Sequence, residues 1–232
     1  MGLAMHNYHD VVGTFPIGRM GSAYNYAPYN DNRRTWAFSI LPYLEQGNLQ
    51  NALNFSLPFY FAENTTVIRT AVKSFQCPSD TPSIQEPDTP YPRGKGSIVV
   101  NWGNTHFFQD EKSSTINGTR NGGPVTYPGD SSGDPFTGPL GTASFAGAPF
   151  KGNLAMGIRD FTDGSSNSVL CGEVIMGPNT GTPNYDHRGD IFNDDYNCAM
   201  FMTYTPPNSK IPDAMAGDAK GEPWCSWRIK NA

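Results

Sequence analysis

The sequence predicts a mixed α+β domain in which helices come first and strands follow. Three early segments have apolar residues at steps of mostly three and four, the spacing of one helix face. They lie at residues 2–12, 41–51 and 64–74. Three later runs are apolar or β-branched and predict strands at residues 97–102, 168–176 and 198–204. This order favours helices that cover one face of an antiparallel sheet.

The first helix has a clear end but no capping residue at its start. Its predicted apolar face consists of Leu3, Met5, Tyr8, Val11 and Val12. Gly13 followed by Pro16 is a stop signal. At the other end Met1 and Gly2 lead straight into the periodic pattern, where an independent helix would have Ser, Thr, Asp or Asn. We therefore expect a further segment before Met1.

The next two helices have weaker boundaries. Pro42 lies near the start of the 41–51 helix, where a first turn tolerates proline. The 64–74 helix follows an Asn-Thr-Thr cap region and ends before the Cys77-Pro78 loop. The Asn-Thr-Thr at Asn64 is also a formal glycosylation acceptor, as is the Asn-Gly-Thr at Asn117.

The strands are bounded by turn residues. Gly96 and Gly103 flank the 97–102 strand, and Asp163-Gly164 precedes the 168–176 strand. We expect Gly164 to adopt a positive φ there. Residues 109–150 are rich in Gly, Pro, Ser, Thr and Asp and exceed an ordinary connection. We interpret residues 1–232 as one domain, with 109–150 as a loop-rich insertion.

Four separated blocks carry a family resemblance. They are GLAMHNYHDVVGTFPIG from Gly2, TWAFSILPYLEQGNL from Thr35, FQCPSD from Phe75 and IRDFTDGSSNSVLCGE from Ile158. In this order they resemble a planctomycete family of prepilin-like proteins of unknown function. The resemblance implies a pilin-like fold, with the N-terminal helix packed on an antiparallel β-sheet and long irregular loops. Members begin with a prepilin-type cleavage site and apolar helix and end with His-x9-Asp-Gly. Both are absent, so we expect a chain truncated at both ends.

Composition favours an extracellular or cell-surface protein. Only 16% of the residues are charged, and there are 25 glycines and 20 prolines. The net charge of −5 argues against nucleic-acid binding, which needs clustered Lys and Arg. No run approaches the roughly 18 apolar residues of a membrane span. Any membrane anchor, and self-association or contact with envelope or filament proteins, is expected through the missing N-terminal helix.

The four cysteines allow several states. Cys77, Cys171, Cys198 and Cys225 form no C-x2-C pair, which argues against a zinc site. Their even number permits three disulfide pairings in an oxidising compartment. Free buried thiols and disulfides both remain open, with Cys198 to Cys225 the preferred bridge.

Two groups of residues have the donor types of a metal site. His6 and His9 share a helix face, but a pair without a third ligand is a weak signal. The stretch with Asp190, Asn193, Asp194 and Asp195 offers the carboxylate and amide oxygens that calcium prefers. It lacks the EF-hand spacing, and a solvated acidic turn is the competing interpretation.

Enzyme motifs for nucleophilic, metal-dependent or phosphate chemistry are absent from the sequence. We therefore expect a non-enzymatic protein with a structural or assembly role. The alternative is a surface-displayed solute- or carbohydrate-binding module, favoured by aromatic side chains in low-charge loops. The tyrosines concerned are Tyr24, Tyr26, Tyr29, Tyr60, Tyr91 and Tyr127.

Overall fold

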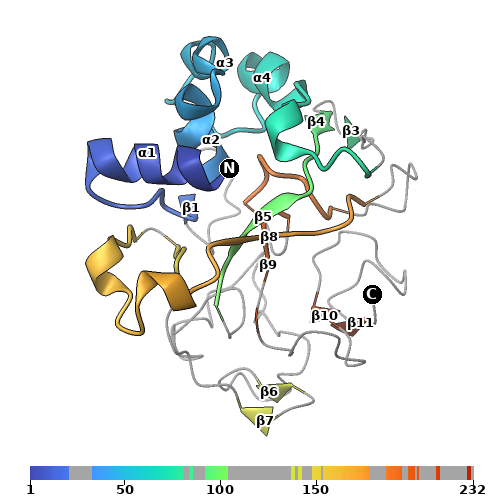
Figure 1. Cartoon of the computed structure of the whole chain (residues 1–232). Coiled ribbons are helices and arrows are strands. Elements are labelled where there is room, and N and C mark those ends of the chain that lie inside the picture. Colours follow the sequence, from blue (N-terminus) through green and yellow to red (C-terminus); the bar gives the residue numbers. More distant parts are fainter. Residues whose placement is uncertain are drawn as a thin grey trace, which may run out of the picture.

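The protein is a mixed α+β structure with its helices gathered on one side of a small central sheet (Figure 1). The computed structural model describes residues 1–20, 33–80, 92–103, 148–152, 154–177, 187–194, 198–201 and 203. It also gives the backbone of five two-residue strands in other parts of the chain. Most of the 109–150 tract lies outside these described residues.

The helical segments are short except for the first. They are α1 (Gly2–Val12), α2 (Trp36–Ile40), η1 (Leu41–Leu44), α3 (Gly47–Asn51), η2 (Ala62–Asn64), α4 (Thr65–Arg69), η3 (Lys73–Phe75), η4 (Ile158–Asp160) and η5 (Ser165–Asn167), where η marks a 3₁₀ helix. In the part of the chain that the structure describes, none of them has the length and apolar character of a membrane-spanning helix.

The strands are shorter still. They are β1 (Arg19–Met20), β2 (Arg34–Thr35), β3 (Ile84–Gln85), β4 (Arg93–Gly94), β5 (Ile98–Asn101), β6 (Thr137–Gly138), β7 (Gly141–Thr142), β8 (Cys171–Glu173), β9 (Met200–Phe201), β10 (Asp213–Ala214) and β11 (Ile229–Lys230). Apart from the sheet around β5, they form two-stranded antiparallel pairs.

The first helix ends as its sequence predicts. Gly13 takes a left-handed conformation with φ 85°, and its N–H donates to the carbonyl oxygen of His9 at 2.7 Å. At the start, Met1 makes no side-chain capping hydrogen bond. The positive φ expected at Gly164 is also confirmed, at 87°.

The buried side of α1 differs from the predicted one. Ala4 and Met5 are buried and Tyr8 packs edge-on against Tyr43, with ring centroids 5.8 Å apart. Leu3 and Val11, by contrast, are 75% and 74% exposed. A rotation of about 100° per residue places Leu3 on the side opposite Met5 and Tyr8, whereas Val11 lies close in angle to Ala4 and is exposed at the end of the helix. α1 packs on the helical segments α2 and η1. The expected packing of this helix on a sheet stays a prediction.

The predicted 41–51 helix begins earlier and is interrupted. α2 starts at Trp36, and the chain continues through η1 into a break at Glu45, which has φ 60°. Pro42 has no N–H to donate within the helical ladder, which favours the tighter η1 turn. The predicted 64–74 helix is likewise divided into α4 and η3, because Thr70 is extended with ψ 121°.

The central sheet has the order β8-β5-β9 and is mixed rather than purely antiparallel. β8 runs antiparallel to β5, with Val100 opposite Cys171. β9 runs parallel to β5, with Val100 opposite Met200. The three strands fall inside the runs predicted from sequence, but each regular ladder is shorter than its run.

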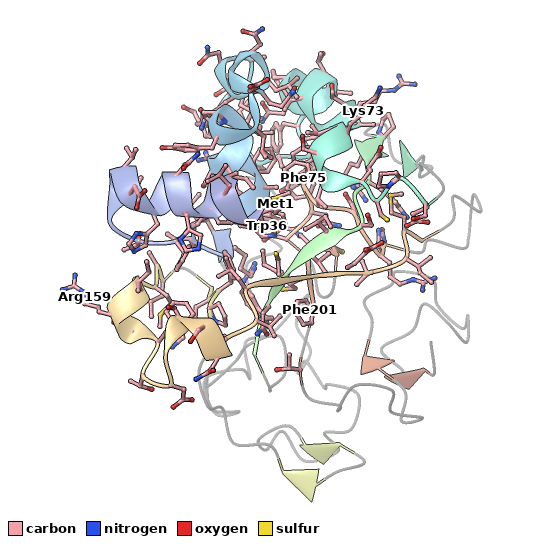
Figure 2. The ribbon with its side chains drawn as sticks, viewed as in Figure 1. Met1, Trp36, Lys73, Phe75, Arg159 and Phe201 are labelled. Carbon is pink, nitrogen blue, oxygen red and sulfur yellow. The ribbon has the colours of Figure 1, made fainter. Side chains whose placement is uncertain are left out.

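One apolar core joins the helices to this sheet. Trp36 and Phe75 meet edge-on with ring centroids 5.6 Å apart, and Figure 2 shows them together in the interior. The Trp36 indole N–H also donates to the carbonyl oxygen of Ala199 at 2.8 Å, just before β9. The core therefore brings the segment before β9 against the early helices.

Candidate functional site

The segment from His187 to Asp194 is pressed into the interior by close backbone contacts. The N–H of Gly96 donates to the Gly189 carbonyl oxygen at 2.8 Å, and the Gly189 N–H donates to Cys198 at 3.0 Å. Gly189 has φ 78°, and a Cβ at this position would clash with the Gly96 carbonyl oxygen. Glycine at residue 189 is therefore required both by conformation and by space.

Asp194 is held by two arginines from the start of the chain. Arg19 Nη2 donates to Asp194 Oδ2 at 2.8 Å, and Arg33 Nε donates to Oδ1 at 2.6 Å. The Asp194 side chain is fully buried, while those of Arg19 and Arg33 are 6% and 12% exposed. Pairing of β1 with β2 places the two arginines close together, because it sets Arg19 opposite Thr35. Two cations on one carboxylate compensate for the loss of hydration.

Asp190 forms the second half of this arrangement. Arg93 Nε donates to Asp190 Oδ2, and His187 Nδ1 lies 3.8 Å from the same oxygen. Burial raises the pKa of the Asp190 carboxyl, but the charge of Arg93, helped by His187, outweighs this. The pKa therefore lies below its ordinary value of 3.8, and Asp190 is ionised at neutral pH. We call Asp190, Asp194, Arg19, Arg33 and Arg93 the ion-pair clasp.

The ion-pair clasp uses side chains that the sequence predicts as calcium ligands. Asp190 and Asp194 are brought to the same buried segment, and Asn193 Oδ1 accepts a hydrogen bond from Arg33 at 3.4 Å. Asp195 lies outside the described residues. Calcium would have to compete with arginine for Asp190 Oδ2 and for both carboxylate oxygens of Asp194, so these contacts favour a structural role. Within the described ranges, no group of three or more His, Cys, Asp or Glu is placed to hold a metal. The calcium site stays a prediction.

The histidines of α1 take part in packing. His6 and His9 each contact the ring of Phe15, with centroids 5.6 and 5.0 Å apart. His9 Nε2 also accepts the backbone N–H of Ile158 at 3.3 Å. This bond ties the end of α1 to η4, a segment 149 residues away in sequence. His9 thus acts as a link between two distant segments.

The described cysteines differ in burial: Cys77 and Cys171 are half-buried and Cys198 is buried. Cys77 and Cys171 carry free thiols, and burial raises the pKa of the Cys171 thiol, which disfavours the reactive thiolate. Cys198 is fully buried. Cys225 lies outside the described residues, so the preferred bridge from Cys198 to Cys225 stays a prediction.

The Asn64 acceptor for glycosylation serves a structural purpose in the folded protein. Asn64 is 1% exposed, and its amide donates to the carbonyl oxygens of Asn54 and Pro58, both at 3.2 Å. Its Oδ1 accepts the Asn54 N–H at 2.8 Å. A glycan on this nitrogen is incompatible with these contacts. Asn117 lies outside the described residues.

Of the loop tyrosines, Tyr60 is the one that the structure describes. It packs against Phe59 and Phe61, with ring centroids 5.3 and 5.5 Å away. The Arg33 guanidinium lies over its ring, 5.7 Å from the centroid. Tyr60 therefore contributes to the support of the clasp. Tyr24, Tyr26, Tyr29, Tyr91 and Tyr127 lie outside the described residues, so the binding-module alternative stays a prediction.

Sequence reasoning missed the basic half of the site. Arg93 and Lys95 are 7% and 0% exposed, and Lys95 Nζ donates to the Gly177 carbonyl oxygen at 2.8 Å. A usable signal was their alternation with Gly94 and Gly96. A Cβ on Gly94 would lie 2.6 Å from the Thr70 carbonyl oxygen, and one on Gly96 would lie 2.7 Å from Phe75. Basic residues spaced by such glycines can lie deep in the protein because the backbone approaches its neighbours closely.

Comparison with known proteins gives a family but no activity. No curated protein and no solved structure matches this chain. Residues 1–227 match the family SBP_bac_10, described as protein of unknown function (DUF1559). The match agrees with the expected relationship to a family of unknown function. Because it covers nearly the whole sequence, this chain belongs to the DUF1559 family.

Proposed function

We propose that this protein is a non-enzymatic, pilin- or pseudopilin-like protein of the cell surface or extracellular space, with a structural or assembly role. The observation that carries the proposal is the set of exposed apolar side chains on α1. Leu3 and Val11 are 75% and 74% exposed there, and Val12 at the helix end is 51% exposed. Leu3 and Val11 lie about two helical turns apart along one side. Exposed apolar side chains grouped in this way are typical of interaction surfaces.

The support beneath this surface also favours an assembly role. On its inner side α1 is fixed by the fully buried Met5 and by Tyr8 against Tyr43. At its end, His9 accepts the Ile158 N–H, and Phe15 N–H donates to the Met156 carbonyl oxygen at 2.7 Å. A rigidly held helix loses little conformational entropy when a partner binds its outer side. The partner in this proposal is another subunit or an envelope or filament protein.

The buried charges fit a structural role as well. Asp190 and Asp194 each bind arginine across long sequence separations, which uses their charge to join segments. A catalytic carboxylate needs access to a substrate, whereas both of these side chains are fully buried. The contacts of the clasp therefore support a stable scaffold that presents α1.

The proposal is tested on intact cells of the source organism with an epitope-tagged chain. Surface labelling and crosslinking are compared for the wild type, Leu3→Asn/Val11→Asn and the matched control Asn7→Ser. Asn7 is exposed and lies between the two apolar residues on the same helix side, so its replacement keeps the apolar surface. We expect surface labelling of all three, and loss of the crosslinked assemblies only in the double variant.

Two results would contradict the proposal. One is a tag that is protected in intact cells and becomes accessible only after lysis. The other is a double variant that enters the same crosslinked assemblies as the wild type while circular dichroism shows both to be folded.

A further inference from the structure

The strand β8 lies at an edge of the central sheet and is open to solvent. No residue from 168 to 175 is buried, and Val169 and Ile175 are 57% and 71% exposed. On the other side of β8 lies β5, whose residues Val99 and Val100 are fully buried. The sheet is therefore covered at its centre and bare along this edge.

The backbone of β8 has hydrogen-bonding groups that point away from β5. The Val174 N–H donates to the Ser97 carbonyl oxygen at 2.8 Å, which fixes the phase of the ladder. Because bonding alternates along an antiparallel pair, the N–H and C=O groups of Cys171 and Glu173 face outward. Among the described strands, β5 is the only partner of β8. The outward groups match those of another extended strand.

The sequence of this edge lacks the features that prevent strand pairing. Protected edges carry lysine, proline, bulges or inward-pointing charges. Residues 168–176 contain neither lysine nor proline, and Glu173 is their single charged residue. Val169 and Ile175 add exposed apolar area on either side of the regular strand. The edge therefore has both the backbone groups and the side chains that favour pairing.

We propose that β8 pairs antiparallel with β8 of a second copy of this chain, about a two-fold axis at Gly172. This register sets Cys171 opposite Glu173 of the second copy and Val169 opposite Ile175 of the second copy, each twice. The two Gly172 residues then form the close, non-hydrogen-bonded pair at the axis, where the absence of a side chain is favourable.

Other two-fold registers of the same edge are worse. A shift of the axis to Glu173 sets two like charges opposite each other, which destabilises the pair. A shift to Cys171 sets Val169 opposite Glu173, an apolar residue against a charge. Only the register at Gly172 brings the two most exposed apolar residues of the segment together. The edge is thus self-complementary, and this favours a second copy over an unrelated strand.

Sedimentation equilibrium of the purified chain tests the inference with Glu173→Pro and the matched control Glu173→Thr. Proline removes one outward N–H per copy and leaves the bonds between β8 and β5 in place. Threonine removes the same charge but keeps the N–H. We expect the wild type and Glu173→Thr to dimerise, and Glu173→Pro to raise the dimer dissociation constant about tenfold or more.

A crosslinking experiment keeps the test valid if the proline variant does not fold. In Glu173→Cys, the new cysteine faces Cys171 of the second copy at a Cα separation of about 5.5 Å, within reach of a disulfide. We expect mild oxidation to give a covalent dimer whose bridge joins positions 171 and 173, identified by mass spectrometry. Glu173→Cys/Cys171→Ser serves as the control and should not form it.

The inference is overturned if the wild type is monomeric throughout the micromolar range, or if folded Glu173→Pro dimerises as tightly as the wild type. A bridge between two copies of position 173 would overturn the Gly172 register. A monomeric chain that captures an unrelated extended peptide would assign the edge to a different partner. The inference deepens the proposed assembly role. Its readout is the mass in solution, so it can fail while surface labelling and the α1 variants still support that role.

Discussion

The two strands that flank β5 differ in burial: β9 lies at a buried edge of the central sheet and β8 at an exposed one. On the β9 side, Cys198, Ala199 and Met200 are at most 1% exposed, and the two acidic residues of the ion-pair clasp, Asp190 and Asp194, precede them in the sequence. On the β8 side no residue from 168 to 175 is buried. Both strands are short and lie in largely apolar runs, so hydrophobicity alone does not decide which of them is buried. The difference comes from charged residues elsewhere in the chain that anchor one side.

The largest effect on stability is expected from a substitution of Asp194 in the ion-pair clasp. Asp194→Asn removes the carboxylate charge shared by Arg19 and Arg33, which leaves two buried guanidinium groups without it. We expect the free energy of unfolding, measured by urea denaturation, to fall by about 3–5 kcal/mol. The control is Asp163→Asn on the exposed turn before η5, which should change it by less than about 0.5 kcal/mol. Equal effects of the two variants would contradict the clasp.

A backbone substitution tests the same side without touching a charge. Gly189→Ala introduces a Cβ at φ 78° and against the Gly96 carbonyl oxygen. We expect a loss of about 2 kcal/mol or more in unfolding free energy. Gly2→Ala is the matched control, because nothing lies within 4 Å of a Cβ there and the residue is helical. That substitution should stabilise the protein slightly. If Gly189→Ala left the unfolding free energy unchanged, residues 187–194 would be shown to have room to shift away from Gly96.

The pH dependence of stability sharpens the comparison further. A carboxyl whose pKa is lower in the folded protein adds stability above its unfolded pKa, and this is lost as pH falls through the folded pKa. Asp190 is such a group, with a folded pKa below 3.8. We expect the unfolding free energy of the wild type to decrease below about pH 4, and Asp190→Asn to show a shallower decrease. If the unfolding free energies of the wild type and Asp190→Asn decreased in parallel with falling pH, Asp190 would be excluded as a source of the acid sensitivity.

The smallest effect is expected on the open side. Val169 is 57% exposed, so Val169→Ser should change the unfolding free energy of the monomer by no more than about 0.5 kcal/mol. Met200→Ser at the covered side serves as the contrast, because Met200 is 1% exposed. Its loss from the core should cost about 2–5 kcal/mol. The measurement is chemical denaturation at low protein concentration, and comparable losses would remove the distinction between the sides.

The sequence predicted what local chemistry determines. Gly13 marks the end of α1, and β-branched residues between glycines mark β5. The break at Glu45 had no such signal, because a glutamate with φ 60° is set by its surroundings rather than by its own preference. The inward side of α1 was also mispredicted. Ala4 is buried while the larger Leu3 is exposed, since the neighbouring helices α2 and η1 decide which side is covered.

The site was predicted in its acidic half only. Clustered Asp and Asn residues are visible as a group, whereas the arginines that bind them come from three separate places in the chain. Arg33 and Arg93 are 161 and 97 residues from their carboxylates. No periodicity or motif connects positions so far apart. The parallel pairing of β9 with β5 was missed for the same reason, because strand direction depends on the path of the intervening chain.

The clasp also has a consequence for the order of folding. The Asp194 bond to Arg19 spans 175 residues, and closing such a loop is slow compared with forming the early helices. During synthesis, residues 1–80 leave the ribosome long before Asp190 and Asp194 exist. At that stage Arg19 and Arg33 do not yet have Asp194 as a partner, and the indole N–H of Trp36 does not yet have the Ala199 carbonyl oxygen. Residues after 187 thus supply the partners that residues 1–80 need for a complete core. A nascent chain that stops before residue 187 should therefore be incompletely folded and sensitive to proteolysis.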